Sequence, residues 1–388
     1  MPLRSVISER EEELPKGELG ELIRIAVEEK DVISFGPGEP DFTPPRHIIS
    51  AVKKAVEKGY THYSPPPGRI ELIKEVAKKL KRENSIDVEY EEIIITAGST
   101  EAILLSLLCV VDPGESVLIP NPGFVVYLPT VELLNGSPLS IPLSKENKFQ
   151  IDTDEIKKLI DPKKTRAIII NTPSNPTGTV FNKKTIEGIA DVAIDNDLLI
   201  ISDEAYEKFV YKGKHISIGS LNGMKDYVLT LHSFSKTHGM AGFRVGYAAG
   251  PEKIIKAMRG LHIYTSICSP TVSQMAAIAA LKGPQSHIRK NVKEYNRRRK
   301  YIIKRLNEIK GFDCLEPEGA FYAFPKIDFK MNSLKFCKWL LKNAKVAVVP
   351  GSDFGMYGEG FIRFSYATSY DKIVKGMNRI EKAVRNLR

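Results

Sequence analysis

The stretch AIIINTPSNPTG, residues 167–178, joins a short run of β-branched residues directly to a cluster of polar and turn-forming residues. Its apolar part lacks polar alternation, which is typical of a strand buried on both faces of a parallel sheet. Comparable apolar runs occupy residues 93–96, 116–120, 198–202 and 227–231. Segments with helical spacing, such as residues 184–195, separate these runs. The alternation predicts an α/β fold with a mainly parallel sheet.

The composition is that of an ordinary globular protein. The chain has 388 residues, of which 42% are hydrophobic and 27% charged, and this length suggests two or three domains. A formal charge of +10 leaves a nucleic acid, an anionic ligand or a lysine-rich surface open as explanations. The longest uncharged apolar stretch, residues 102–111, is about half of a membrane span, and the N-terminus lacks the apolar core of a signal peptide. We therefore expect a soluble, cytoplasmic protein.

The four cysteines indicate neither a metal site nor a disulfide framework. Cys109, Cys268, Cys314 and Cys337 are far apart in the chain, and none belongs to a C-x-x-C motif. We expect a reducing environment and no bound metal.

The character of the chain changes near Gly283, where it becomes strongly basic and helical. Short apolar strands are expected within residues 319–324, 346–349 and 360–366, and a last helix from Tyr370. We expect a large domain of residues 46–283 and a small α+β domain of residues 1–45 and 284–388. The N-terminal segment should pack on the small domain without a sheet strand of its own.

Polar residues follow three of the predicted strands. Lys236, in the motif S-F-S-K, comes after the run 227–231, whereas Asp203 and Tyr206 follow the run 198–202. Asn175 follows the run 167–171. A single loop lysine is more often a solvated side chain, and the other residues alone are ordinary turn or cap chemistry. Together at the carboxyl edge of one sheet, a lysine, a carboxylate, a phenol and an amide suit a heteroaromatic aldehyde cofactor bound as a Schiff base.

A fourth strand end leads into a helix through Gly98, Ser99 and Thr100. The free N–H groups of such a helix start favour a phosphate, although a plain N-cap explains these residues equally well. The chain lacks G-x-G-x-x-G after a first strand and G-x-x-x-x-G-K-[ST], so dinucleotide and Walker-type sites are disfavoured.

Five motifs in chain order resemble those of the class I/II aminotransferases, and the resemblance extends from about residue 32 to residue 369. They are G-E-P-D-F (38–42), N-P-T-G (175–178), S-D-E-x-Y (202–206), S-x-S-K (233–236) and G-x-R-x-G (242–246). The chain looks most like the prokaryotic and archaeal aspartate or aromatic branch. The resemblance implies the fold type I of pyridoxal-phosphate-dependent transferases, with the cofactor bound by the large domain.

The resemblance also implies roles at the cofactor ring. Lys236 would form the Schiff base and move the proton between the substrate Cα and the cofactor. Asp203 would pair with the pyridine nitrogen and keep it protonated. Tyr206 and Asn175 would hydrogen-bond the phenolic oxygen, and Phe124 would stack on the ring, where Tyr or Trp is more usual.

The remaining implied residues bind the phosphate and the substrate. The phosphate would be held by Gly98, Ser99, Thr100, Ser233, Ser235 and Arg244, and by Tyr63 of a neighbouring subunit, which implies a homodimer. The substrate carboxylate would bind Arg363 in a bidentate fork, with Gly38 and Asn175 close to it. Arg46 and Arg69 are candidates for binding a second carboxylate, but neither matches the family well. His238 departs from the family pattern and is interpreted as a core or supporting residue.

These features predict an aminotransferase of amino acid metabolism. It would transfer the α-amino group of aspartate, an aromatic or a similar amino acid to a 2-oxo acid such as 2-oxoglutarate. A C–S β-lyase or synthase of the same fold is the alternative. A transcription regulator with a fused DNA-binding module is disfavoured, because the segment before Val32 is short and acidic.

Overall fold

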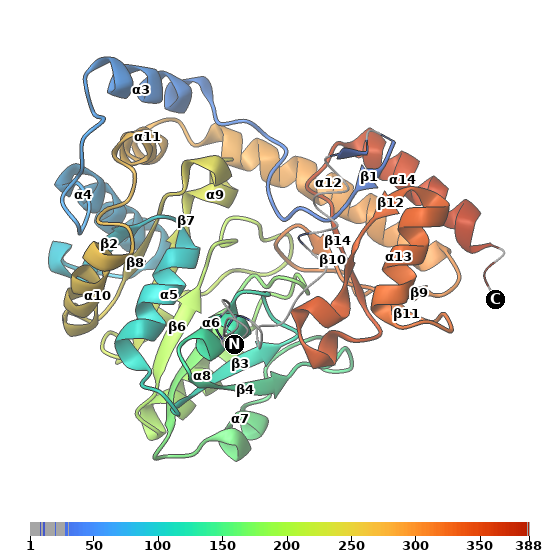
Figure 1. The fold of residues 1–388 in the computed structure, drawn as a ribbon, viewed down its shortest axis with the longest axis horizontal. Helices are drawn as coiled ribbons and strands as arrows, with labels where there is room; N and C mark the ends of the chain where they lie inside the picture. Colours follow the sequence, from blue (N-terminus) through green and yellow to red (C-terminus); the bar gives the residue numbers. More distant parts are fainter. Residues whose placement is uncertain are drawn as a thin grey trace, which may run out of the picture.

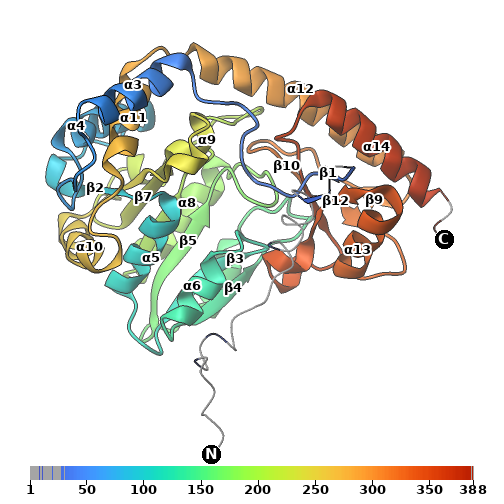
Figure 2. The same ribbon diagram turned by 45° about the horizontal axis from the view of Figure 1, so that its top comes forward.

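A seven-stranded mixed sheet forms the centre of the larger part of the molecule (Figures 1 and 2). The computed structural model describes residues 31–385 together with residues 8, 11, 20, 28, 29 and 387. The strand order is β2 (Ile93–Thr96), β8 (Gly246–Ala249), β7 (Val228–Ser233), β6 (Leu199–Asp203), β5 (Thr165–Asn171), β3 (Ser116–Asn121) and β4 (Ser137–Pro142). Only β8 runs antiparallel to its neighbours within this sheet. The predicted mainly parallel sheet is confirmed.

Two strands of this sheet were not expected from the apolar runs. Strand β4 contains Pro138 and Pro142, which are tolerated because β4 is an edge strand. Strand β8, with the sequence GYAA, carries no Val, Ile or Thr to mark it as a strand.

Helices cover both faces of the sheet, which explains why its strands are apolar throughout. Ile169 and Ile201 pack on one face with α5 (Ser99–Val110) and α10 (Glu252–Thr265). Ile168 and Ile200 pack on the opposite face with α7 (Thr153–Leu159) and α8 (Lys183–Asp195). Around β2 and β8 a further core is completed by α3 (Arg46–Glu57), α4 (Ile70–Lys79) and α11 (Thr271–Lys282). Neighbouring residues of a strand therefore face two different hydrophobic cores.

The rest of the described chain forms a smaller α+β unit beside the sheet, joined to it by the long helix α12 (Figure 2). It contains α12 (Ser286–Glu308), β9 (Phe312–Asp313), β10 (Tyr322–Ala323), β11 (Lys326–Ile327), α13 (Ser333–Ala344), β12 (Val346–Ala347), β13 (Val349–Pro350), β14 (Ile362–Ser365) and α14 (Tyr370–Val384). Short helical turns occupy Leu80–Asn84, Tyr90–Glu92, Ile218–Ser220, Ala241–Phe243, Gly351–Phe354 and Met356–Gly358.

The expectation that the N-terminal segment has no strand is wrong in one respect. Strand β1 (Ile33–Ser34) pairs in parallel with β12, and Phe35 continues into the core of the smaller unit. Two residues are too few to show a period, so the sequence pattern could not reveal this strand. Most of residues 1–30, on which the expectation also rested, lie outside the described residues.

The basic helix α12 is not simply a solvated face. Arg298 and Arg299 are buried; Arg298 pairs with Asp41, and Arg299 with Glu316. Part of the positive charge therefore holds the smaller unit together. Within the described chain, none of the helices combines the length and apolar character that crossing a membrane requires.

Candidate active site

The carboxyl ends of β5, β6 and β7 open into one cavity of about 180 Å³. Its lining consists of Gly38, Ser99, Thr100, Phe124, Tyr127, Asn171, Asn175, Asp203, Ala205, Tyr206, Ser233, Ser235, Lys236, Arg244, Tyr322 and Arg363. The structure thus brings together the candidate residues except Gly98 and Tyr63, and except Arg46 and Arg69, which do not line the cavity. Gly98 lies directly behind the lining, whereas Tyr63 is 79% exposed and lies outside it.

Lys236 enters the cavity from α9 (Phe234–Thr237), the short helix that follows β7 without a loop. Its Nζ donates a hydrogen bond of 2.5 Å to the carbonyl oxygen of Gly38. Burial lowers the pKa of Lys236 to about 8, because the charged form loses its hydration. About a tenth of the amine is therefore unprotonated at pH 7, far more than for an ordinary lysine, as a nucleophilic lysine requires.

Asp203 ends strand β6 and is almost fully buried. Its Oδ1 accepts a hydrogen bond of 3.1 Å from the backbone N–H of Ala205, and its Oδ2 accepts one of 2.8 Å from the hydroxyl of Tyr127. Burial raises the pKa of Asp203, and these two hydrogen bonds oppose that rise by favouring the carboxylate. The arrangement fixes a carboxyl group at the floor of the cavity.

One end of the cavity is lined by hydrogen-bond donors. Helix α5 begins at Ser99, so its first N–H groups have no partner within the helix, and Ser233 and Ser235 add hydroxyls. The guanidinium of Arg244 is held by the carbonyl oxygens of Ala241 and Ala97, at 3.0 and 3.4 Å. This set of donors fits a phosphate group.

Gly98 is required by the same end of the cavity. Its φ of +85° is rarely adopted by other residues, and a Cβ there would lie 2.7 Å from Nη2 of Arg244. Glycine at this position therefore lets the start of α5 and the guanidinium approach one another.

Arg363, on β14, forms another wall of the cavity. Its Nη1 donates a hydrogen bond of 2.9 Å to Oδ1 of Asn175. Its guanidinium carbon lies 4.7 Å from the ring centre of Tyr322 and 4.8 Å from that of Phe354. Among the described residues, its buried Nε has no hydrogen-bond partner. A buried guanidinium with a spare donor fits a small carboxylate ligand.

Four lining residues were missed by the sequence reasoning: Tyr127, Asn171, Ala205 and Tyr322. Asn171 is the last residue of a predicted strand, and its amide bridges the N–H of Asn175 and the carbonyl of Asp203. Tyr127 begins α6 (Tyr127–Leu133) three residues after Phe124, and the two rings pack edge to face. Nothing in the local sequence pattern points to Tyr322, because the smaller unit brings it to the cavity.

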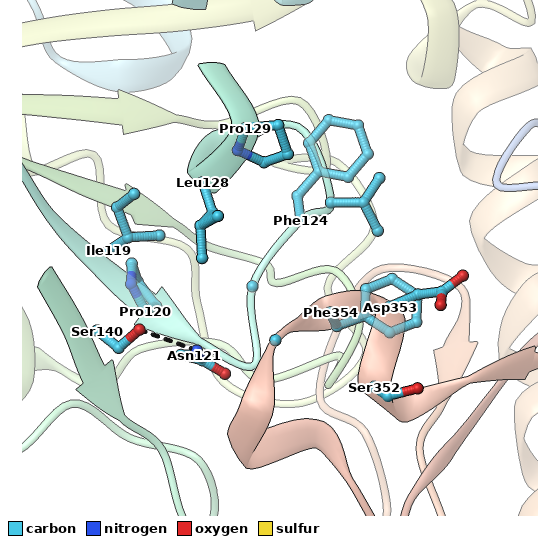
Figure 3. A pocket seen from close by; sticks show the side chains of 13 residues that line it. Ile119, Pro120, Asn121, Phe124, Leu128, Pro129, Ser140, Ser352, Asp353 and Phe354 are labelled. Carbon is cyan, nitrogen blue, oxygen red and sulfur yellow. Dashed lines mark hydrogen bonds between the residues drawn. The ribbon is translucent and has the colours of Figure 1, made fainter. Parts of the chain in front are cut away.

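A second cavity, of about 360 Å³, adjoins the first, since Phe124 lines both (Figure 3). Leu128 and Pro129 give it an apolar lining on one side, while Ser352, Asp353 and Phe354 lie on the other side. The space next to the candidate site can therefore accept apolar groups.

His238 does not line either cavity. Its Nδ1 lies 3.2 Å from Nε2 of His287, and its ring stacks on Phe234. Burial lowers the pKa of His238 to about 3, so the side chain is neutral. This environment is that of a packed core histidine.

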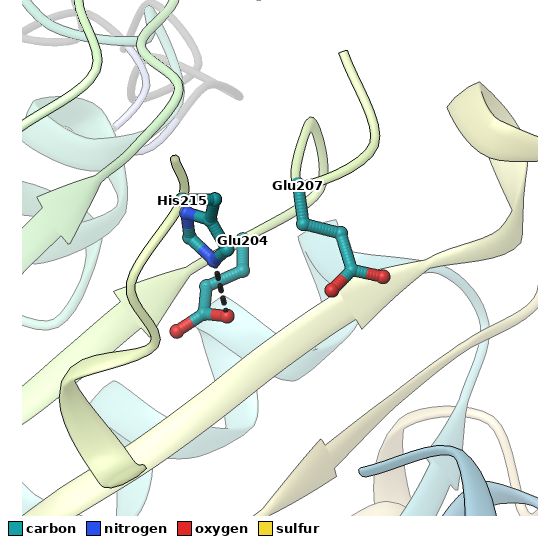
Figure 4. Close-up of side chains that lie close together, drawn as sticks. All are labelled: Glu204, Glu207 and His215. Carbon is teal, nitrogen blue, oxygen red and sulfur yellow. Dashed lines mark hydrogen bonds and ion pairs between the residues drawn. The ribbon is translucent and has the colours of Figure 1, made fainter. Parts of the chain in front are cut away.

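Just after β6, Glu204, Glu207 and His215 offer ligand atoms within 4.8 Å of one another (Figure 4). Glu204 accepts hydrogen bonds from Ser217 and pairs with His215 at 2.8 Å. Glu207 forms an ion pair with the buried Lys79. Because the chain's own donors and cations already engage both carboxylates, the group serves as a buried ionic network that anchors the end of β6.

Comparison with known proteins gives a consistent result. The family model described as "Aminotransferase class I and II" matches residues 30–380. An aspartate aminotransferase of Pyrococcus abyssi is 46% identical over 98% of both chains, and aromatic-amino-acid aminotransferase 2 of Thermococcus litoralis is 45% identical over 98% of both. The crystal structure of an aromatic aminotransferase from Pyrococcus horikoshii has a TM-score of 0.89 at 45% identity, covering 95% of this chain and 98% of that one.

The geometry at Gly98 makes a first prediction about the donor-lined end. Gly98→Ala places a Cβ against Arg244, so the Kd for pyridoxamine 5′-phosphate, which does not react with Lys236, should rise by about tenfold or more. Titration calorimetry measures this Kd. Gly114→Ala is the matched control, because Gly114 also has φ of +85° but nothing lies within 4 Å of its added Cβ. Equal Kd values for the two variants would contradict a phosphate site beside Gly98.

The lowered pKa of Lys236 makes a second prediction. Only the unprotonated amine attacks an aldehyde, so capture of pyridoxal phosphate by the cofactor-free protein should accelerate as the pH rises, with a midpoint near pH 8, and level off about one pH unit higher. Stopped-flow absorbance at a series of pH values measures the rate. Lys236→Ala should show no covalent capture at any pH. A profile that keeps rising to pH 10 would show that the pKa of Lys236 is not lowered.

Proposed function

The chain belongs to the class I and II aminotransferases, which are pyridoxal-phosphate-dependent enzymes, and we propose that Lys236, Asp203 and Tyr206 are its catalytic residues. As a member of this family it transfers an amino group from an α-amino acid to a 2-oxo acid. The observation that carries the assignment of residues is the buried Lys236 amine, placed between a donor set that suits phosphate and an arginine that suits a carboxylate. A C–S β-lyase or synthase is not favoured, because the whole-chain relatives are named as aminotransferases.

The roles follow from the chemistry of each side chain. When bound, pyridoxal phosphate supplies an electrophilic carbon and a ring that accepts electrons from the substrate Cα. Lys236 would hold the cofactor and, as a free amine, would take the proton from the substrate Cα and deliver it to the carbon of the cofactor that had been the aldehyde carbon. Asp203, whose carboxylate form is favoured by the hydrogen bonds from Tyr127 and Ala205, would hold a proton on the ring nitrogen. Tyr206 and Asn175 donate hydrogen bonds to the phenolic oxygen.

The binding residues surround these groups. Phe124 covers one face of the ring, and the phosphate is held by Gly98, Ser99, Thr100, Ser233, Ser235 and Arg244. Arg363 binds the substrate carboxylate, assisted by Asn175 and by the backbone at Gly38. Amino donors include aspartate, aromatic or similar amino acids, and 2-oxoglutarate is an acceptor. The apolar wall of the adjoining cavity supports donors with aromatic side chains.

The site is completed, in this proposal, by a second copy of the chain. Tyr63 is exposed on the loop that precedes α4. The end of α10 contacts this loop, because Nδ1 of His262 lies 2.8 Å from the carbonyl oxygen of Pro66. The same end of α10 exposes Tyr264 by 87% and Ile263 by 49%. Exposed aromatic and aliphatic side chains of this kind support a subunit interface, across which Tyr63 would reach the neighbouring phosphate.

We also propose a division into a large cofactor-binding domain, residues 46–283, and a small domain, residues 1–45 and 284–388. The separate core formed mainly by residues of β10, β14, α12, α13 and α14 supports this division. A cytoplasmic location and a role in amino acid biosynthesis complete the proposal.

The reaction itself is tested by supplying donors and acceptors in turn. We expect a 2-oxo acid to form from the donor in catalytic amounts only when an acceptor is present, with the parallel-line kinetics of a ping-pong reaction. Lys236→Ala should lower kcat by at least about a hundredfold, whereas Lys225→Ala, at an exposed lysine, should not change it. Release of ammonia without an acceptor would instead support a lyase.

The shared site is tested with mixed dimers. Tyr63→Ala dimers should bind the cofactor weakly, and Lys236→Ala dimers should be inactive. A dimer with one subunit of each kind contains one complete site, and free exchange of equal amounts makes such dimers about half of the total. Mixing should therefore restore about a quarter of the activity of the native dimer at limiting cofactor. Native mass spectrometry verifies that the subunits exchange. Exchange without recovered activity would contradict the role of Tyr63 across the interface.

A further inference from the structure

Tyr322 brings a second phenol to the candidate site from the smaller unit. It lies on β10, is fully buried, and lines the cavity with Tyr206. The two hydroxyl oxygens are 2.6 Å apart, which is a hydrogen bond between residues 116 positions apart in the chain. The two rings also pack edge to face, with centres 5.6 Å apart. Their relative position is therefore set by both packing and hydrogen bonding.

The surroundings of Tyr322 hold its hydroxyl at this point. The guanidinium of Arg363 lies over the Tyr322 ring, 4.7 Å from its centre. A Cβ at Gly38 would lie 2.4 Å from the Tyr322 oxygen, so glycine at position 38 makes room for this hydroxyl. These contacts come from β14 and from the segment after β1, on two sides of the ring.

The direction of the hydrogen bond between the two phenols decides which hydroxyl keeps its proton free for a ligand in the cavity. Burial raises the pKa of both Tyr206 and Tyr322, so both are protonated at neutral pH. The carbonyl oxygen of Gly38 is a poor alternative acceptor for Tyr322, because it lies 3.5 Å away and already accepts from Lys236 at 2.5 Å. The best acceptor for the Tyr322 proton is thus the oxygen of Tyr206. Tyr206 then keeps its own proton for another partner.

We infer that Tyr322 is a positioning residue that donates its hydrogen bond to Tyr206 and directs the Tyr206 proton at the phenolic oxygen of the cofactor. The inference rests on the proposed role of Tyr206. A hydroxyl that accepts a hydrogen bond becomes a stronger donor in a buried chain, so Tyr322 strengthens the bond that Tyr206 makes. The positive charge of Arg363 over the Tyr322 ring polarises its O–H group in the same sense.

The pH dependence of the visible absorption of the loaded enzyme, without substrate, tests this inference. That absorption reports the proton shared between the Lys236 linkage and the phenolic oxygen. A donor to the oxygen stabilises the deprotonated, anionic form, so loss of the donor raises the pKa of the titration. Tyr206→Phe should raise it directly. Tyr322→Phe, which keeps the ring beside Arg363, should raise it by about 0.3–1 pKa unit, the worth of one ordinary hydrogen bond.

The double variant separates action through Tyr206 from direct action. Adding Tyr322→Phe to Tyr206→Phe should produce no further shift. Tyr366→Phe is the matched control, because Tyr366 is also fully buried in the smaller unit and its hydroxyl meets the carbonyl of Ala320 at 3.4 Å. This control should titrate like the native enzyme.

The inference is overturned if Tyr322→Phe titrates like the native enzyme while Tyr206→Phe shifts. It is also overturned if the Tyr322→Phe shift persists in full in the Tyr206→Phe background. If Tyr206→Phe itself causes no shift, the proposed role of Tyr206 fails and this inference fails with it. Should Tyr322→Phe not fold, Gly38→Ala displaces the Tyr322 hydroxyl and should raise the pKa of the same titration; an unchanged titration there counts against the inference.

Discussion

The side-by-side alignment of β5, β6 and β7 is the constraint on which the rest of the site depends. In the parallel register Asn171 lies opposite Asp203, and Asp203 lies opposite Leu231, two residues before Ser233. Both faces of these strands are buried under helices, so polar side chains at the carboxyl ends have only the space beyond the sheet edge available to them. The apolar interior of the sheet and the polar cavity are therefore two consequences of one topology.

The charged groups of the cavity are costly to bury, and the chain compensates each of them only in part. Asp203 receives two hydrogen bonds but no cation in contact, and Lys236 finds a single carbonyl oxygen. Arg363 donates hydrogen bonds to Asn175 and to the carbonyl oxygen of Gly36 but keeps its buried Nε unpaired. By contrast, Glu207 just after β6 is paired with Lys79. Incomplete pairing of charged groups in the cavity is the pattern expected where ligands supply the missing partners.

Sequence reasoning reached the residues whose position follows from the end of a strand. Asn175, Asp203 and Lys236 each come within a few residues of an apolar run, so parallel pairing alone predicts that they meet. Tyr127 and Tyr322 could not be found in this way. The helix containing Tyr127 must fold back over the sheet before its hydroxyl meets Asp203, and Tyr322 depends on how the smaller unit packs. Strand β8 was missed for a different reason, since its alanines and glycine fit a narrow space and carry no β-propensity signal.

The turn that follows β5 contacts the cavity on one side and the segment before β10 on the other. Asn175 faces the cavity and bonds Arg363, whereas Gly178, three residues later, faces away from it. Gly178 has φ of +69°, a Cβ there would lie 2.4 Å from Cβ of Pro317, and its carbonyl oxygen accepts from the N–H groups of Glu318 and Gly319. Glycine is thus needed because the segment before β10 lies against this turn. Since the same segment continues to Tyr322, the turn couples the position of Asn175 to that of the second phenol, and the stretch that predicts the sheet also joins the two units at the site.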